Sequence, residues 1–540
     1  MASFRTTLGE DIFKAKYAQN QYQTWDDKAH SIVNTVCGDL NGTKNNLLGK
    51  EERDQLVRYI ADFKFLPGGR YIYYAGREAR FLNNCYLLKA EEDTREEWAD
   101  LWRRAGSCLM TGGGIGIDVS AFRPKGRSLG RTGGVSSGPI PFLLATNEIG
   151  RHVMQGGSRR SAMYGSMNWQ HEDAQDFLTV KNWTDEVRAA KEADFNAHAP
   201  LDMMNVSLNY DDAWLSNMNS EVFMKNIKQA MRTGEPGFSF NFGEKQNETL
   251  RNACCEIVSS DDSDVCNLGS VNMANIENIE EFKDVVSLGS KFLVCGLIRA
   301  ELPYKKVEEV RQQNSRLGLG LMGMHEWLLK RGHRYEVNDE LNRWLSTYAK
   351  YSEKAANEHC DRLYLNKPKG YRAIAPTGTI SMLAGTTSGL EPVYSVAYKR
   401  RYLTDGTKWK MQYAIDGTAE ALIADGIAPE SIESAVDLAA DPERRIKFQH
   451  DVQKYVDQAI SSTINLPSWG SELNNEDRIA TFAQSVQRYA KGLRGLTFYP
   501  DGSRGGQPIT SVPYEDAIGK TGVVFEDNSE MACKDGVCGI

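Results

Sequence analysis

The chain has 540 residues, of which 41% are hydrophobic and 25% are charged, and 64 basic against 72 acidic residues give a net charge of −8. This balance argues against a protein that binds the phosphate backbone of nucleic acid, because that task needs a basic face. Mean hydropathy is −0.49, and an apolar run such as residues 292–298 is far shorter than the ~18 residues of a membrane span. We therefore expect neither a nucleic acid nor a membrane as partner.

The cysteines and the first residues indicate a reducing compartment. Ten cysteines in 540 residues are too few for a disulfide scaffold. The first ten residues contain no apolar core of a signal peptide. We expect a protein of the cytoplasm, or of the host cytoplasm if a phage encodes it, in which cysteine pairs serve chemistry.

Hydrophobic spacing and glycine clusters predict an α/β protein. Residues 1–65 read as polar and helical. From residue 66 onward, glycine clusters separate short apolar segments from helix-like stretches, a pattern typical of parallel α/β construction. The last residues are polar and contain glycine, which is typical of a mobile tail. Helices are predicted over 51–65, 96–109, 142–154, 338–363, 441–464 and 476–493, a strand over 496–499 and the tail over 515–540.

Several common motifs are absent from the sequence. It has neither a Gly-x-x-x-x-Gly-Lys-Ser/Thr phosphate loop nor a His-Glu-x-x-His zinc motif. None of the eight histidines has a glutamate three positions before it, so the chain lacks the Glu-x-x-His pair of a carboxylate-bridged dimetal bundle. We expect no metal site within this chain.

The segment around Asn252, Cys254 and Glu256 is the first candidate for catalysis. In an extended backbone these alternate side chains share a face, while Cys255 points the other way and is expected to serve packing. A thiol between an amide and a carboxylate suits sulfur chemistry beside a general base. On this segment alone, a buried cysteine in a strand with two polar neighbours is the simpler explanation.

Four further cysteines stand out by position. Cys266 follows that segment, Cys85 lies far upstream, and Cys533 and Cys538 end the chain. A dithiol on a flexible tail can reach another site and exchange disulfides there. Taken alone, the terminal pair is also compatible with a chance pair or half of a zinc site.

Taken together, these cysteines resemble those of the large catalytic chain of a ribonucleotide reductase. Further matching motifs lie in the same order at 112–118, 123–126, 155–160, 376–381 and 387–392. The resemblance covers about residues 65–540. It implies a ten-stranded α/β barrel of two parallel five-stranded halves with a central finger loop. The implied parts are a short helical region over 1–65, the barrel with its effector region over 66–514 and a redox-active tail over 515–540.

The resemblance also implies roles for the triad. Cys254 becomes a transient thiyl radical that abstracts the 3′ hydrogen of a ribonucleotide. Glu256 accepts the proton of the 3′-hydroxyl, and Asn252 orients the substrate or the carboxylate. The product is a 2′-deoxyribonucleotide, and the sequence leaves open whether the substrate is a diphosphate or a triphosphate.

Loss of the 2′-hydroxyl as water needs two electrons, which the family's reducing pair supplies. By resemblance this pair is Cys85 and Cys266, whose Cα atoms must then come within about 4.4–6.8 Å. Cys533 and Cys538 would re-reduce the pair and be recharged by a thioredoxin-like partner.

Substrate and effector residues are likewise implied by the resemblance. A loop before an apolar stretch suits the substrate phosphates, although a capped helix start explains it equally well. The expected substrate residues are Asn84, Pro376, Thr377, Gly378, Thr379, Ile380 and Ser381. The family's specificity effector is a deoxynucleoside triphosphate such as dTTP with Mg²⁺, bound at a homodimer interface. The expected effector residues are Asp93, Arg123, Lys125, Arg127, Gln155 and Arg159, although solvated cations on a glycine turn are an alternative.

The radical source stays open at this point. Residues 497–504 resemble the adenosylcobalamin-dependent class. The class that uses a separate ferritin-like dimetal subunit normally has two adjacent tyrosines, and this chain has Phe498 and Tyr499, so Tyr499 is the one candidate relay. The chain has features between the two classes and resembles the small reductase chains of marine cyanophages. No motif of the regulatory ATP cone precedes residue 65, so control of overall activity by ATP and dATP is not expected.

Two other functions compete with this interpretation. A nucleotide-binding regulator or thiol–disulfide oxidoreductase without radical chemistry would tolerate loss of Asn252 and Glu256. A glycyl-radical enzyme would need a glycine loop near the C-terminus, where Gly502 stands, but the full set of cysteines would then have no purpose.

Overall fold

The computed structural model describes residues 4–39, 46–130, 133–153, 161–194, 197–265, 267–404, 408–424, 426–503 and 509–526. Five residues singled out in the sequence lie outside the described residues: Gln155, Arg159, Cys266, Cys533 and Cys538. None of the helices in the described part of the chain combines the length and the apolar character that a membrane crossing requires.

The larger sheet has eight strands in the order β14-β15-β6-β5-β4-β3-β2-β9. Its middle strands β2 to β6 run parallel to one another, as helical crossovers allow. Strand β3 is buried along its whole length, which is typical of a parallel sheet covered on both faces. The strands are β2 (Cys85–Lys89), β3 (Gly114–Asp118), β4 (Met163–Asn168), β5 (Met204–Tyr210), β6 (Gly237–Phe240), β9 (Asp264–Val265), β14 (Thr463–Leu466) and β15 (Gly495–Pro500).

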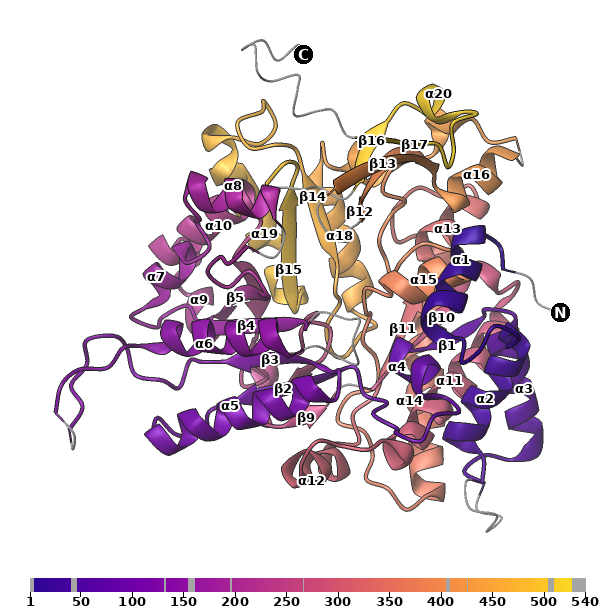
Figure 1. Cartoon of the computed structure of the whole chain (residues 1–540), viewed down its shortest axis with the longest axis horizontal. Helices are drawn as coiled ribbons and strands as arrows, with labels where there is room; N and C mark the ends of the chain where they lie inside the picture. The colour runs from indigo at the N-terminus through magenta and orange to yellow at the C-terminus, as the bar shows by residue number, and fades with distance from the viewer. Residues whose placement is uncertain are drawn as a thin grey trace.

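A second set of strands begins at β10 (Leu268–Asn272), which pairs parallel with β11 (Gly318–Met322) and antiparallel with β1 (Phe65–Pro67). Parallel bridges continue the series from Leu319 to Arg372 and from Ile374 to Ile460. Strand β14 then runs parallel to β15, which is antiparallel to β6 of the first set. In Figure 1, β15 stands between the two sets of strands. The expected α/β class is confirmed.

The helices lie mostly where hydrophobic spacing predicts them. The helix over 96–109 is α5 (Arg95–Met110), that over 338–363 is α14 (Asp339–Arg362), and that over 476–493 contains α19 (Ile479–Tyr489). Further helices that cover the strands are α6 (Pro139–His152), α7 (Ala174–Thr179), α8 (Asp185–Ala193), α10 (Glu221–Thr233), α11 (Ile279–Arg299), α12 (Lys305–Asn314), α13 (Met324–Lys330) and α15 (Gly378–Ala384).

The helix predicted over 441–464 is wrong in length. Helix α18 (Pro442–Gln453) ends early, and β14 occupies the last residues of the predicted range. The Gln453 side chain donates to the carbonyl oxygens of Val456 and Gln458 at 2.7 and 2.8 Å. A turn stabilised by a side chain therefore ends this helix, without the glycine or proline that would mark it in the sequence.

The N-terminal region packs onto the second set of strands. It contains α1 (Thr7–Ile12), the π-helix η1 (Phe13–Tyr17), α2 (Trp25–Cys37) and α3 (Lys50–Ala61). Their buried residues share one hydrophobic core with α11, α13 and α14, and Figure 1 shows these indigo helices beside α11. The first set of strands forms a separate core with α5, α6 and α10.

A separate small antiparallel sheet has the strand order β16-β12-β13-β17. It consists of β12 (Ala397–Thr404), β13 (Lys408–Ile415), β16 (Ile509–Val512) and β17 (Val524–Glu526). Because β17 pairs with β13, residues up to Glu526 belong to a sheet, although the sequence predicts a tail from residue 515. The rest of that tail lies outside the described residues.

Candidate active site

Asn252, Cys254 and Glu256 lie in the loop between two short antiparallel strands, β7 (Leu250–Arg251) and β8 (Val258–Ser259). The extended backbone expected for them is wrong. The Cys255 N–H donates to the Asn252 carbonyl oxygen at 3.0 Å, and Cys255 has a φ of 71°, so the chain makes a tight turn. Cys254 and Glu256 nevertheless both face one cavity, because the turn brings the residues on either side of Cys255 to the same side.

This finger loop crosses directly over β3. A Cβ atom added at Gly116 would lie 1.8 Å from the carbonyl oxygen of Arg251, and one added at Gly114 would lie 2.9 Å from Ala253 Cβ and 3.2 Å from Cys85 Sγ. Such distances leave no room for a side chain, so glycine at both positions allows the contact. The alternating glycines were visible in the sequence, but nothing there indicated what would pack on them.

Arg251 holds the base of the finger loop in place, and sequence reasoning missed it. Its guanidinium is buried and donates to the Asn241 side-chain oxygen at 2.7 Å and to the Arg494 carbonyl oxygen at 3.1 Å. Burial lowers the pKa of Arg251 to about 10. The Ala459 N–H donates to the Glu256 carbonyl oxygen at 2.9 Å. These bonds fix the loop against the neighbours of β14 and β15.

A cavity of about 390 Å³ lies beside the loop. It is lined by Cys254, Glu256, Cys85 and Asn84. Strands β3 to β6 lie between Cys85 and Cys254 in the sequence. The loop before α15 forms another wall. The predicted substrate residues that line the cavity are Asn84, Pro376, Thr377, Gly378, Thr379 and Ile380. Its volume lies in the range of small-molecule sites.

Ser381 and Asn252 are buried and are not among the residues that line the cavity. The Ser381 hydroxyl shares a hydrogen bond of 2.6 Å with that of Ser388. The Asn252 side-chain oxygen accepts the Ile257 N–H at 3.0 Å. Its Nδ2 is buried and has no hydrogen-bond partner among the described residues. Asn252 therefore closes the loop turn with one end of its amide and keeps a donor near Glu256.

Glu256 is a deeply buried acid at the edge of the cavity. Its side chain is 1% exposed, and Oε2 has no hydrogen-bond partner within the described part of the chain. Burial raises the pKa of Glu256 to about 7, and its own backbone N–H and the nearby Asn252 amide oppose this rise without cancelling it. A carboxyl with a pKa near neutrality suits proton transfer at physiological pH.

Cys254 also borders a second, much smaller cavity of about 20 Å³. The opposite wall of this cavity includes Gly495, Leu496 and Thr497 of β15, and Cys255 lines it too. The half-buried Cys254 therefore has one side toward the larger cavity and another toward β15.

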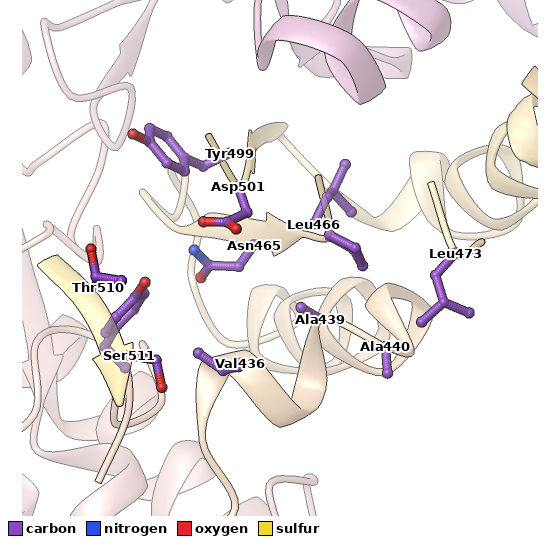
Figure 2. Close-up of a pocket in the computed structure, with 12 residues that line it drawn as sticks. Val436, Ala439, Ala440, Asn465, Leu466, Leu473, Tyr499, Asp501, Thr510 and Ser511 are labelled. Carbon is purple, nitrogen blue, oxygen red and sulfur yellow. The ribbon is translucent and has the colours of Figure 1, made fainter. Parts of the chain in front are cut away.

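A third cavity of about 310 Å³ lies further along the same strands and includes Tyr499. Figure 2 shows polar side chains, among them Asp501, Asn465 and Thr510, at one end, and apolar side chains such as Leu466 and Leu473 at the other. Thr497 and Tyr499 are alternate residues of β15, so the strand connects this cavity with the one beside Cys254.

The predicted effector residues in the described part of the chain lie at the β3–α6 connection and nearby. Arg123 forms an ion pair with Asp93 and donates to the Ser128 carbonyl oxygen at 3.2 Å. The exposed Arg127 pairs with Glu172. The Lys125 N–H donates to Asp173 Oδ2 at 3.0 Å. The structure thus brings Asp93 and Arg123 together, with Lys125 and Arg127 on the same connection.

Known proteins are similar to this chain over most of its length. The family model for the ribonucleotide reductase barrel domain matches residues 83–233, 216–360 and 369–499. A vitamin B12-dependent ribonucleoside-diphosphate reductase of Mycobacterium tuberculosis is 26% identical over 87% of this chain and 75% of its own. A putative adenosylcobalamin-dependent ribonucleoside-triphosphate reductase of Mycobacterium phage D29 is 23% identical, with 98% of each chain covered.

The fold is also similar to a solved structure. The crystal structure of a B12-dependent, class II ribonucleotide reductase has a TM-score of 0.71 to this chain at 17% identity, over 95% of this chain and 94% of the other. That likeness supports the α/β fold described above. The family match includes the finger loop, the strands around it and the loop before α15. Because it extends over more than half of the sequence, this chain belongs to the ribonucleotide reductase family.

Proposed function

We propose that this chain is the catalytic chain of an adenosylcobalamin-dependent ribonucleotide reductase, which reduces ribonucleoside di- or triphosphates to 2′-deoxyribonucleotides. One observation carries the proposal. The thiol of Cys254, the carboxyl of Glu256 and Cys85 border the same cavity as the loop before α15. This reaction requires a thiol, a base and a loop that can hold phosphates, all around a cavity large enough for a nucleotide.

In the proposed reaction, the Cys254 thiyl radical takes the 3′ hydrogen atom of the ribose. The Glu256 carboxylate accepts the 3′-hydroxyl proton, and its pKa of about 7 allows it to hold or release that proton near neutral pH. The 2′-hydroxyl leaves as water after a thiol of the reducing pair, Cys85 and Cys266, has given it a proton. Cys254 then returns a hydrogen atom to C3′ and becomes a thiyl radical again.

The two electrons for loss of the 2′-hydroxyl come from Cys85 and Cys266, which become a disulfide. Cys85 lines the cavity at the start of β2, which supports its share of this role, while Cys266 lies outside the described residues. The terminal pair Cys533 and Cys538 would exchange thiols with this disulfide, followed by a thioredoxin-like reductant.

The cavity beside Tyr499 fits part of an adenosylcobalamin. Hydroxyl, amide and carboxylate groups of Asn465, Asp501 and Thr510 suit a nucleoside, and Leu466 and Leu473 suit a flat apolar surface. When bound, adenosylcobalamin supplies an organic radical that can take a hydrogen atom from a thiol. The names of the relatives support this source over a separate dimetal subunit, and Tyr499 then lines the cofactor site without carrying an electron.

The finer features of the family follow as part of the proposal. Two series of strands support a ten-stranded barrel of two halves. One series runs from β2 to β6, and the other runs from β10 through β11, residues 372–374 and β14 to β15. A dNTP effector such as dTTP would bind near Asp93, Arg123, Lys125 and Arg127, in a homodimer of this chain.

The test is formation of labelled dCDP or dCTP from CDP or CTP with dithiothreitol and dTTP. We expect turnover with adenosylcobalamin alone, and turnover only with a metallated ferritin-like partner would refute this cofactor and assign Tyr499 as a relay. No turnover from a folded protein that still binds dTTP would instead support a nucleotide-binding regulator.

A pair of cysteine variants separates chemistry from folding. We expect Cys254→Ser to abolish turnover, because an oxygen radical at this position is not accessible to the same source. Cys360 is a buried cysteine of α14 outside the lining of the three cavities described above. Cys360→Ala, as the matched control, should keep turnover.

A further inference from the structure

The N-terminal segment, residues 4–17, packs against the helix that follows the proposed phosphate loop. Figure 1 shows α1 next to α15. A Cβ atom added at Gly9 of α1 would lie 2.7 Å from the carbonyl oxygen of Leu383 in α15. The two helices therefore approach so closely that only glycine fits at this position.

Polar contacts tie the same segment to the far end of α15. Arg5 forms an ion pair with Glu326 and donates to the carbonyl oxygen of Gly385 at 3.0 Å. The Glu326 carboxylate is fully buried and also accepts from Lys330 at 2.8 Å and from Thr386 at 2.6 Å. Because several donors fix the orientation of this buried carboxylate, its ion pair also holds Arg5 in position.

An aromatic cluster anchors the rest of the segment. The ring centroid of Phe4 lies 5.6 Å from that of Phe13 and 5.5 Å from that of Phe63. Trp25 contacts Phe13 edge-on at 5.6 Å and stacks on Phe63 at 5.1 Å. Because aromatic pairs in such arrangements stabilise a fold beyond the area that they bury, the segment is held firmly against the rest of the chain.

Tyr17, the last residue of η1, enters the substrate cavity. It is 6% exposed and lines the cavity together with Cys254, Glu256 and Gly378. Its hydroxyl lies 2.9 Å from where a Cβ atom of Gly69 would be, and Gly69 lines the same cavity. The Tyr17 hydroxyl therefore lies at the wall of the cavity, next to Gly69.

We propose that Tyr17 contacts the bound nucleotide and donates its hydroxyl hydrogen to a phosphate oxygen. The inference rests on the proposed function and adds to it a residue from the N-terminal segment. Ile380 and Met382 of α15 also line the cavity, and the segment packs on α15. Tyr17 therefore reaches the cavity from the side on which the phosphates would lie. A charged acceptor makes such a hydrogen bond stronger than one between neutral groups.

The first test measures equilibrium binding of labelled CDP and CTP to the full chain, together with turnover. Loss of a hydrogen bond to a charged group costs ~1.5–3 kcal/mol, so Tyr17→Phe should raise Kd and KM by roughly tenfold or more in a variant that still unfolds in one cooperative transition. Tyr22, which is 82% exposed in the same region, gives the matched control, and Tyr22→Phe should change neither constant.

A second variant tests whether the hydroxyl itself is responsible. Gly69→Ala places a methyl group against the Tyr17 hydroxyl, but only ordinary contacts of 3.8 and 3.9 Å arise with the ring carbons. We expect Gly69→Ala to weaken nucleotide binding in the wild-type background and to have little further effect in the Tyr17→Phe background. Equal fold-changes in both backgrounds would show that the methyl group acts on its own, and would overturn the proposal.

Failure of this inference differs from failure of the proposed function. If the wild-type chain binds neither nucleotide, the proposed function fails. If it binds them and Tyr17→Phe binds them equally well, the role of Tyr17 alone is refuted, and the residue serves packing only.

Discussion

Replacing Glu256 by glutamine removes a buried acid and keeps its size, so it separates what the carboxyl does for catalysis from what it costs the fold. The side chain is 1% exposed, and burial raises its pKa from 4.5 to about 7. In the unfolded chain the group ionises near its ordinary pKa. Between the two values the folded protein holds a proton that the unfolded chain has released, so stability falls as pH rises.

The size of this effect follows from the pKa difference. At 1.36 kcal/mol per pKa unit, the rise at Glu256 corresponds to roughly 3 kcal/mol of unfolding free energy. This stability is fully present below pH ~4.5 and is lost by pH ~7. Glu256→Gln cannot ionise, so it should match the wild type near pH 5 and be more stable by roughly that amount at pH 8.

The assay is thermal unfolding of both proteins at pH 5 and pH 8, with turnover measured on the same samples. Comparing the change between the two pH values cancels every other titrating group. The variant should gain stability at pH 8 and lose activity by about 10²–10⁴-fold, the usual contribution of a general base. Unfolding midpoints that shift in parallel at both pH values would refute the burial argument, and full activity of the variant would refute the role as base.

Three glycine and tyrosine variants test the rest of the site. Gly116→Ala should displace the finger loop, because its methyl group would lie 1.8 Å from the Arg251 carbonyl oxygen. We expect a lower unfolding midpoint and loss of turnover. Gly106→Ala is the control, because its methyl group would meet no atom within 4 Å. Gly378→Ala also meets no protein atom within 4 Å, so it should fold normally and raise the KM of the nucleotide, and an unchanged KM would place the phosphates elsewhere. Tyr499→Phe should keep turnover with adenosylcobalamin. Loss of turnover in this variant would instead indicate that the Tyr499 phenol relays an electron.

Local patterns predicted the helices well and the irregular segments poorly. Helices α5 and α14 carry apolar residues at helical spacing over their whole length, and the sequence located both within a few residues. The end of α18 depends on hydrogen bonds of Gln453 to residues beyond the helix. A bond of that kind has no signature in spacing or composition, so the predicted helix ran on into β14.

The candidate site shows the same division. Types and order of residues pointed to Cys254 and Glu256, but the turn that aims them depends on a φ of 71° at Cys255, which no residue preference predicts. Tyr17 was not a candidate at all. Its position in the cavity results from the packing of α1 on α15, two elements that lie far apart in the sequence, and no local pattern in either element indicates that they pair.

The position of Cys254 between two cavities has a consequence for how the reagents of this reaction meet. In the proposed reaction, a nucleotide on one side of the thiol and the radical source on the other would need to exchange only a hydrogen atom. The sulfur is then the point of exchange, because Cys254 borders the larger cavity and also the small cavity that Gly495, Leu496 and Thr497 of β15 line. A different radical source could therefore act from the β15 side without any change in the residues that hold the nucleotide.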